Sequence, residues 1–178
     1  MVILIAYPRK PSTLKSVDEL YNAKLIKHQL YRAHGGNMEL YQHLIVGLDL
    51  SEDSAKVLRK AARIAADSGA KLTVAHITEP LAFAYGGDVP IDLSEAQGMI
   101  EHQAKKRLAA LVEEVNISAD IIVSIGETAS ELHHLAKDRA ADLLVVGSHG
   151  RHGFAMLFGS VTKGVVSGAS CDVLAIRV

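Results

Sequence analysis

The chain has 178 residues, of which 49% are hydrophobic, and its formal net charge at pH 7 is -1. This length is sufficient for one domain with a sizeable core. The balanced charge excludes the basic footprint of a nucleic-acid or membrane-surface protein, and the single cysteine excludes an internal disulfide and is typical of a reducing compartment. We therefore expect a cytoplasmic protein with neither nucleic-acid nor membrane partners.

The first part of the chain differs from the rest. An apolar run from Val2 to Tyr7 is interrupted by Pro8, has no preceding basic residues and is too short to span a bilayer. Met38 lies a few residues before the first regular strand pattern. We expect a compact domain over residues 38–178, with residues 1–37 as an extension that is either an appendage or an upstream mis-start of translation.

Five short apolar runs follow, each of the length of a strand. They are His43 to Leu48, Lys71 to Ile77, Asp120 to Ile125, Asp142 to Gly147 and Asp172 to Arg177. Several of these runs are continuously apolar rather than alternating, which is typical of strands covered on both faces. The pattern predicts a parallel sheet.

Helical patterns lie between the runs. One has apolar residues at helical spacing from Leu58 to Ala65, and a second extends from Ile100 to Val115. Thr128 and Glu131 form a T-x-x-E capping box that predicts a helix start near 128, and a last helix is expected near 160 to 167. The alternation βαβαβαβαβ predicts a doubly wound α/β domain.

A glycine-rich stretch follows the fourth run, over residues 147–160, which we term the glycine loop. Gly147 and Gly150 allow backbone N–H groups to approach an anion closely, and Gly159 and Ser160 open the last helix. A helix start adds unpaired N–H groups and the positive end of the helix dipole. The loop therefore predicts a phosphate site, with a purely structural strand-to-helix loop as the alternative.

A carboxylate lies at the end of the first run. Asp49 follows Gly47 and Leu48, and ligands of open parallel sheets bind beyond the carboxyl ends of strands, where the strand order reverses. If the first and fourth strands are neighbours, Asp49 and the glycine loop face one crevice, so the carboxylate could accept hydrogen bonds from a ribose or an adenine edge. The alternative is that Asp49 caps the next helix.

Other kinds of site are disfavoured by what the sequence lacks. Neither a G-x-x-x-x-G-K-[ST] loop nor a G-x-G-x-x-G after the first strand occurs. The nine histidines are not at ligand spacing with carboxylates or cysteines, so no metal site is predicted. Nothing in the sequence resembles a catalytic dyad.

From about Tyr41 to Val178 the sequence resembles the universal stress protein family. The stretches that carry the resemblance are 43–52, 75–77, 142–150 and 171–177. The resemblance implies the adenine nucleotide alpha-hydrolase-like fold, with a five-stranded parallel sheet of order 3-2-1-4-5 and helices on both faces. It also implies a cytoplasmic stress-response role, a homodimer and, in one branch of the family, ATP or AMP binding.

The resemblance also implies which residues touch the nucleotide. Asp49 and Ile77 would contact the adenosine part. The ribose and phosphates would be held by Gly147, Gly150, Gly159, Ser160 and Val161.

Two rival functions remain open. Eight residues separate Gly150 from Gly159, one fewer than in the nucleotide-binding branch, and the stretch from Ala84 to Leu93 is similar to a branch thought not to bind ATP. The first rival is thus an interaction module of the same fold. The second is a slow ATPase or self-phosphorylating protein that uses a hydroxyl of the glycine loop or the helix after it, namely Ser148, Ser160 or Thr162.

The last run also predicts how two copies would associate. Val173, Leu174 and Ile176 form an apolar strand that would lie at the edge of the sheet. Because exposed apolar edges promote unwanted pairing, we expect a homodimer to form through this strand.

Overall fold

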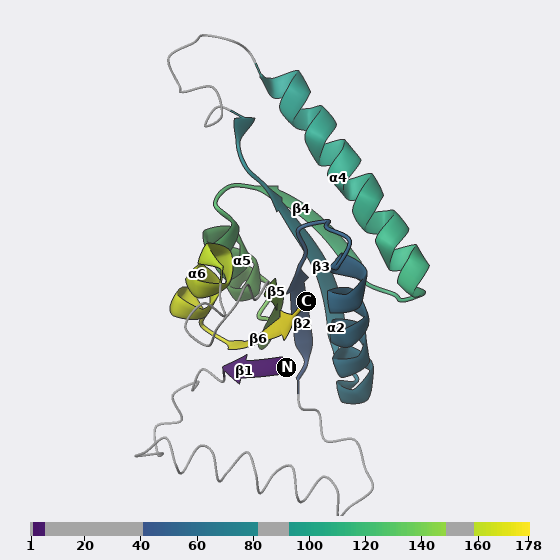
Figure 1. Cartoon of the computed structure of the whole chain (residues 1–178), viewed down its shortest axis with the longest axis vertical. Coiled ribbons are helices and arrows are strands. Elements are labelled where there is room, and N and C mark those ends of the chain that lie inside the picture. Colours follow the sequence, from purple (N-terminus) through teal and green to yellow (C-terminus); the bar gives the residue numbers. More distant parts are fainter. Residues whose placement is uncertain (1, 6–40, 82–92, 149–158) are drawn as a thin grey trace, which may run out of the picture.

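The structure, a computed structural model, describes residues 2–5, 41–81, 93–148 and 159–178. These residues form a six-stranded sheet of order β1-β6-β5-β2-β3-β4 (Figure 1). The strands are β1 (Val2–Ile5), β2 (His43–Gly47), β3 (Lys71–Thr78), β4 (Asp120–Ile125), β5 (Leu143–Ser148) and β6 (Asp172–Arg177). The helices in the described parts are α2 (Ser54–Ser68), α4 (Ser94–Val115), α5 (Thr128–Asp138) and α6 (Ser160–Gly168).

The predicted parallel sheet is confirmed. Strands β2 to β6 pair in parallel, and counted from β2 their order is 3-2-1-4-5. β2 and β5 are neighbours in the middle of the sheet, with Gly47 opposite Val146. Their side chains are buried on both faces, which explains why these runs are continuously apolar.

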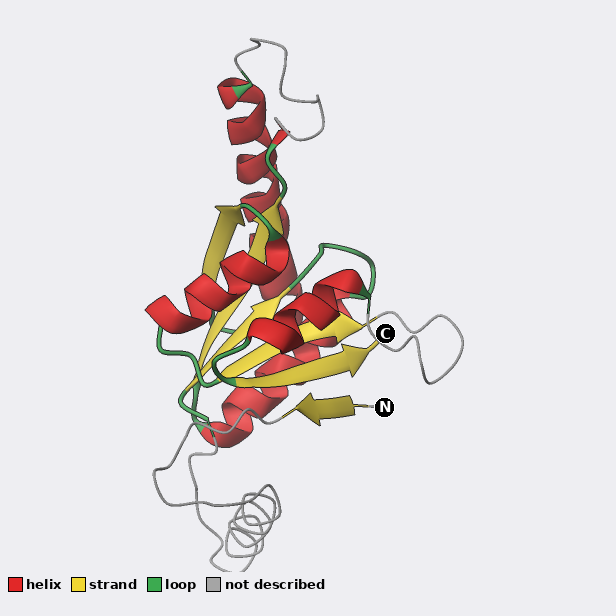
Figure 2. Ribbon diagram, turned by 90° about the vertical axis from the view of Figure 1, so that its left-hand side faces the viewer, coloured by secondary structure: helices red, strands yellow, loops and turns green. Residues whose placement is uncertain are grey.

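Helices cover the two faces of the sheet in pairs (Figures 1 and 2). On one face, α2 packs on β2, β3 and β5, and α4 packs on β3 and β4. Leu58 of α2 and Leu108 of α4 are buried in the same core cluster as Val46. On the other face, α5 and α6 bury Leu132 and Val165 against neighbouring strands. Successive residues of β2 thus serve different cores, as the alternation of a strand requires.

β1 is a sixth strand that the sequence did not predict. It pairs antiparallel with β6, with Val2 opposite Ile176 and Ile5 opposite Val173. Four residues cut off by a proline are too short a run to be recognised as a strand, and only the open edge of β6 gives them a partner. The division of the chain at residue 38 stays a prediction.

The start of α5 differs from the predicted capping box. The helix begins at Thr128 as expected, but its N-cap is Glu127, whose carboxylate accepts hydrogen bonds from the N–H groups of Ala129 and Ser130. Glu131 instead accepts a 2.6 Å hydrogen bond from the Ser124 hydroxyl on β4. The box prediction was wrong because a carboxylate one residue earlier takes the capping position.

The amino ends of the parallel strands are joined by carboxylates. Asp142 accepts hydrogen bonds from the N–H groups of Gln42 and His43 at 3.0 Å, and the Tyr41 hydroxyl donates to Asp172 at 3.2 Å. Burial, followed by the charge of Asp172, raises the pKa of Tyr41 above its usual range. At this end of the sheet, hydrogen bonds from the protein's own groups therefore occupy the carboxylates of Asp142 and Asp172.

Candidate functional site

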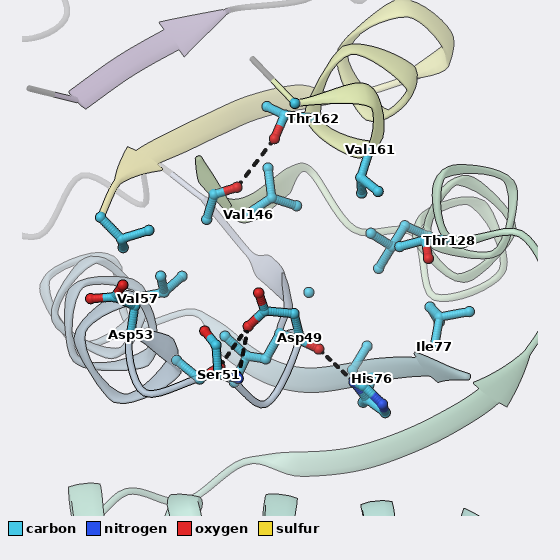
Figure 3. A pocket seen from close by; sticks show the side chains of 18 of the residues that line it. Asp49, Ser51, Asp53, Val57, His76, Ile77, Thr128, Val146, Val161 and Thr162 are labelled. Carbon is cyan, nitrogen blue, oxygen red and sulfur yellow. Dashed lines mark hydrogen bonds between the residues drawn. The ribbon is translucent and has the colours of Figure 1, made fainter. Parts of the chain in front are cut away.

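A cavity of about 320 Å³ lies at the opposite end, beyond the carboxyl ends of β2, β3 and β5 (Figure 3). Within the sheet, β2 has β3, the next strand in the chain, as its neighbour on one side and β5 as its neighbour on the other. The cavity is therefore at the switch point of the sheet, where ligands of this architecture bind. Its walls also include the starts of α2, α5 and α6.

Asp49 forms one side of the cavity. Its Oδ1 atom accepts hydrogen bonds from the Ser51 N–H and the Ser54 hydroxyl, both at 3.0 Å, which fix the turn between β2 and α2. The N-cap of α2 is Asp53, so the alternative that Asp49 is the cap residue is wrong, although Asp49 does order the turn. Figure 3 shows its carboxylate turned toward the cavity.

The start of α6 forms the opposite side. Gly159 is the N-cap, and among the described residues no side chain caps it. The first backbone bond of the helix runs from Lys163 N–H to the Gly159 carbonyl at 3.0 Å, so the N–H groups of the three preceding residues lie before the helical ladder. This end of the helix has the positive pole of the dipole and no acidic residue in its first turn.

The start of α5 also lines the cavity, but its N–H groups are already occupied by Glu127. Hydrogen bonds from the Ser130 side chain and from the N–H groups of Ser130 and Ala129 lower the pKa of Glu127, despite a small opposing effect of burial. The Glu127 carboxylate therefore already takes the place of an anion at the start of α5. The start of α6 is better suited to bind an anionic ligand.

Apolar side chains and a histidine complete the walls. Ile77 at the end of β3 and Val146 on β5 are buried, and Val161 at the start of α6 is 43% exposed (Figure 3). His76 Nδ1 lies 2.7 Å from the Leu48 carbonyl oxygen, and because a carbonyl only accepts, Nδ1 donates. This bond holds the strand end that carries Asp49.

The structure brings most of the sequence-predicted site residues to this one cavity. Asp49, Ile77, Gly147, Gly159, Ser160 and Val161 all line it. Gly150 and the shortened part of the glycine loop lie outside the described residues, as does the similarity over 84–92. The role of the predicted residues as nucleotide contacts stays a prediction.

Sequence reasoning named Thr162 only as a hydroxyl of the enzymatic rival, and it missed other residues of the walls. Thr162 donates a hydrogen bond from its hydroxyl to the Gly147 carbonyl at 3.2 Å and so ties α6 to β5. Because Thr162 follows the predicted site residue Ser160 by two positions, the sequence could have indicated that it lies near the cavity. Thr128 and Leu132 line the cavity only because α5 packs beside α6, which no local pattern reveals.

The hydroxyls of the rival enzymatic interpretation are in different environments. Ser148 and Thr162 are buried, whereas Ser160 is exposed at the start of α6. Within the described ranges no group of three or more His, Cys, Asp or Glu side chains is placed to hold a metal ion. Over the same ranges, no helix has the length and apolar character needed to cross a bilayer.

Comparison with known proteins gives one consistent family. The profile of the "Universal stress protein family" matches residues 40–177. A Coxiella burnetii protein named "Universal stress protein A homolog 2" is 38% identical over 146 residues, which are 79% of this chain and 98% of that relative.

Solved structures of similar proteins include nucleotide complexes. A universal stress protein solved in complex with cAMP is 32% identical, with a TM-score of 0.53, and the match covers 77% of this chain and 97% of that one. A universal stress protein from Archaeoglobus fulgidus in complex with dAMP is 25% identical, with a TM-score of 0.53 and coverage of 77% and 98%.

Proposed function

The chain belongs to the universal stress protein family, and we propose that it binds an adenine nucleotide, ATP or AMP, in the cavity between Asp49 and the start of α6. The observation that carries this proposal is that the Asp49 carboxylate and the start of α6 lie on opposite sides of one cavity. A carboxylate that accepts hydrogen bonds lies on one side, and a helix start without a side-chain cap among the described residues lies on the other.

The charges of the walls favour one orientation of the ligand. Asp49 repels phosphate but accepts hydrogen bonds from ribose hydroxyls or an adenine amine. The start of α6 attracts phosphate through its N–H groups and its dipole. We therefore expect the nucleoside near Asp49 and Ile77, and the phosphates near Gly159 and Ser160.

Steric space supports the same orientation. A Cβ atom built at Gly159 would meet no heavy atom of the described residues within 4 Å, and the φ angle of -60° suits any residue. Within the described part of the chain, the glycine is thus required neither by a close neighbour nor by backbone strain. A phosphate that approaches the helix start would use that open space.

Two relatives support the class of ligand, since one was solved with cAMP and the other with dAMP. We infer a cytoplasmic stress-response protein that senses or buffers a nucleotide rather than converting a substrate.

The predicted homodimer contact would use the outer edge of β6, and in the single chain β1 pairs with that edge. An interaction module of the same fold remains the rival.

The proposal is tested by placing a carboxylate where the phosphate should lie. In Gly159→Asp, the new side chain fits the open space and is a favoured N-cap, so the helix should be at least as stable as before. The same carboxylate would occupy the N–H groups and repel phosphate. Gly159→Ser is the matched control, because serine caps the helix without a charge.

Calorimetric titration of nucleotide-stripped protein with ATP, AMP and adenosine is the measurement. We expect Gly159→Asp to weaken ATP binding at least about tenfold and adenosine binding by less than about twofold, with Gly159→Ser between wild type and Gly159→Asp. Wild-type protein that binds no ATP or AMP at millimolar concentration would overturn the proposal and favour the interaction module. Equal loss of ATP and adenosine binding would contradict the proposed orientation.

A further inference from the structure

His76 connects the end of β2 to β3 at the point where the two strands part. The register of β2 and β3 ends at Gly47 and Ala75, and the N–H group of Leu48 still donates to the Ala75 carbonyl at 2.9 Å. The carbonyl of Leu48 accepts a hydrogen bond from His76 Nδ1 at 2.7 Å (Figure 3). This carbonyl belongs to the planar peptide unit that leads into Asp49. The imidazole thus fixes the peptide immediately before Asp49.

The turn after this peptide depends on attachment to its surroundings. The hydrogen bonds from Ser51 and Ser54 to Asp49 come from the turn itself and from the start of α2, so they shape the turn without connecting it to β3. Leu50 has a φ angle of 59°, in the left-handed region that a leucine rarely adopts. Such a backbone persists only where neighbouring contacts hold it. The bond from His76 is a contact of this kind, made by a neighbouring strand.

The end of β3 serves both residues that we expect to contact the nucleoside. Successive side chains of a strand point to opposite faces of the sheet. His76 holds the turn that carries Asp49, whereas Ile77, the next residue, packs with the core beneath α5 and α6 and lines the cavity directly. β3 therefore carries Ile77 itself and places Asp49 through His76.

The phosphate side of the cavity is attached to a different strand. The buried Thr162 hydroxyl donates to the Gly147 carbonyl at 3.2 Å and connects the start of α6 to β5. β5 pairs with β2 and β6, and β3 pairs with β2 and β4. The hydrogen bonds of Thr162 and His76 share no residue. The two sides of the cavity are thus positioned by different side chains.

We propose that His76 is a positioning residue for the nucleoside half of the binding site and that Thr162 has the same role for the phosphate half, a division that rests on the proposed nucleotide function. A change at His76 alters how Asp49 lies relative to Ile77 and leaves the start of α6 in place. Affinity for the nucleoside and affinity for the phosphates therefore respond to different substitutions.

Three substitutions of His76 separate positioning from direct contact with the ligand. In His76→Asn, the amide nitrogen is bonded to Cγ, as Nδ1 is in histidine, so it can donate to the Leu48 carbonyl. In His76→Gln, the amide nitrogen lies one bond further along the side chain and matches Nε2 instead. His76→Leu removes the donor. Positioning predicts rescue by asparagine, and direct contact through Nε2 predicts rescue by glutamine.

NMR titration with ATP and adenosine is the measurement, because it also quantifies weak binding, and circular dichroism checks folding. We expect His76→Leu and His76→Gln to weaken the binding of both ligands about tenfold, with His76→Asn within about threefold of wild type. Thr162→Val, which lacks the hydroxyl, should weaken ATP binding about fivefold and adenosine binding by less than about twofold.

The spectra of the free protein test the positioning without a ligand. The ring-nitrogen signals of neutral His76 should show the proton on Nδ1. The amide signals of Asp49 and Ser51 should shift in His76→Leu and return toward their wild-type positions in His76→Asn.

Four results would overturn the inference. They are a neutral His76 ring with its proton on Nε2, rescue by glutamine and not by asparagine, wild-type binding of both ligands in His76→Leu, and equal loss of ATP and adenosine binding in Thr162→Val. A wild type that binds neither ligand would remove the proposed nucleotide function, and the spectra of the free protein would still decide whether His76 positions Asp49.

Discussion

At the amino end of the parallel strands Asp142 accepts hydrogen bonds from the backbone of Gln42 and His43, and at the carboxyl end Asp49 accepts them from Ser51 and Ser54. Both carboxylates thus order a segment next to a central strand. Only Asp49 also borders the cavity. One residue type thus orders the chain at both ends of the sheet, and at the carboxyl end it also borders the cavity.

The difference follows from what surrounds each carboxylate. Asp142 lies where the strand starts come together and where Tyr41 and Asp172 add a further hydrogen bond. Asp49 lies where neighbouring connections leave in opposite directions and where three helices begin around an open space. Substitutions at the amino end should therefore change the free energy of unfolding, and those at the carboxyl end should change nucleotide affinity.

The largest effect is expected for Asp142→Ala. This change leaves the N–H groups of Gln42 and His43 without their acceptor, and the free energy of unfolding should fall by about 2–3 kcal/mol. Urea unfolding measures the change. Asp142→Asn keeps an acceptor oxygen and should lose less, and both variants should bind ATP as wild type does. A loss of ATP affinity in Asp142→Ala would contradict the view that the amino end of the sheet determines stability and not nucleotide binding.

A smaller effect is expected for Asp49→Asn. The amide oxygen can still accept the hydrogen bond from Ser51, so the free energy of unfolding should change by less than about 0.5 kcal/mol. Loss of the carboxylate should weaken AMP binding about tenfold, equivalent to about 1.4 kcal/mol, measured by calorimetric titration. Asp142→Asn is the matched substitution at the other end. Unchanged AMP affinity in Asp49→Asn would remove this carboxylate from the proposed site.

The smallest effect concerns pH and Glu127. Its pKa is lowered from 4.5 by hydrogen bonds at the start of α5, so its stabilising contribution is fully present above pH 4.5 and is lost as the pH falls through the lowered value. Thermal unfolding of wild type and Glu127→Gln between neutral and acidic pH measures this. The difference between the two proteins should shrink on acidification. A constant difference would mean that the charge of Glu127 does not contribute.

The sequence predicts most strongly what depends on local patterns. The strand runs and their parallel pairing are confirmed, as is the strand order 3-2-1-4-5 that the family resemblance implies. Asp49 and Gly147 reach one cavity because β2 and β5 are neighbours. β1 was missed because four apolar residues become a strand only when a tertiary edge accepts them. Thr128 joins the cavity wall through the packing of two helices, which no spacing along the chain encodes.

Three contacts hold α6 against β5 and α5. Thr162 is bonded to the Gly147 carbonyl, and His133 of α5 donates a 2.8 Å hydrogen bond from Nε2 to the Val165 carbonyl. A Cβ atom at Gly164 would lie 2.9 Å from the Cβ of Ala129, so the glycine permits the close approach of the two helices. The donors of α6 are thus preorganised before any anion arrives. An anion that binds at these donors, as we propose, would find α6 already in place, which favours affinity.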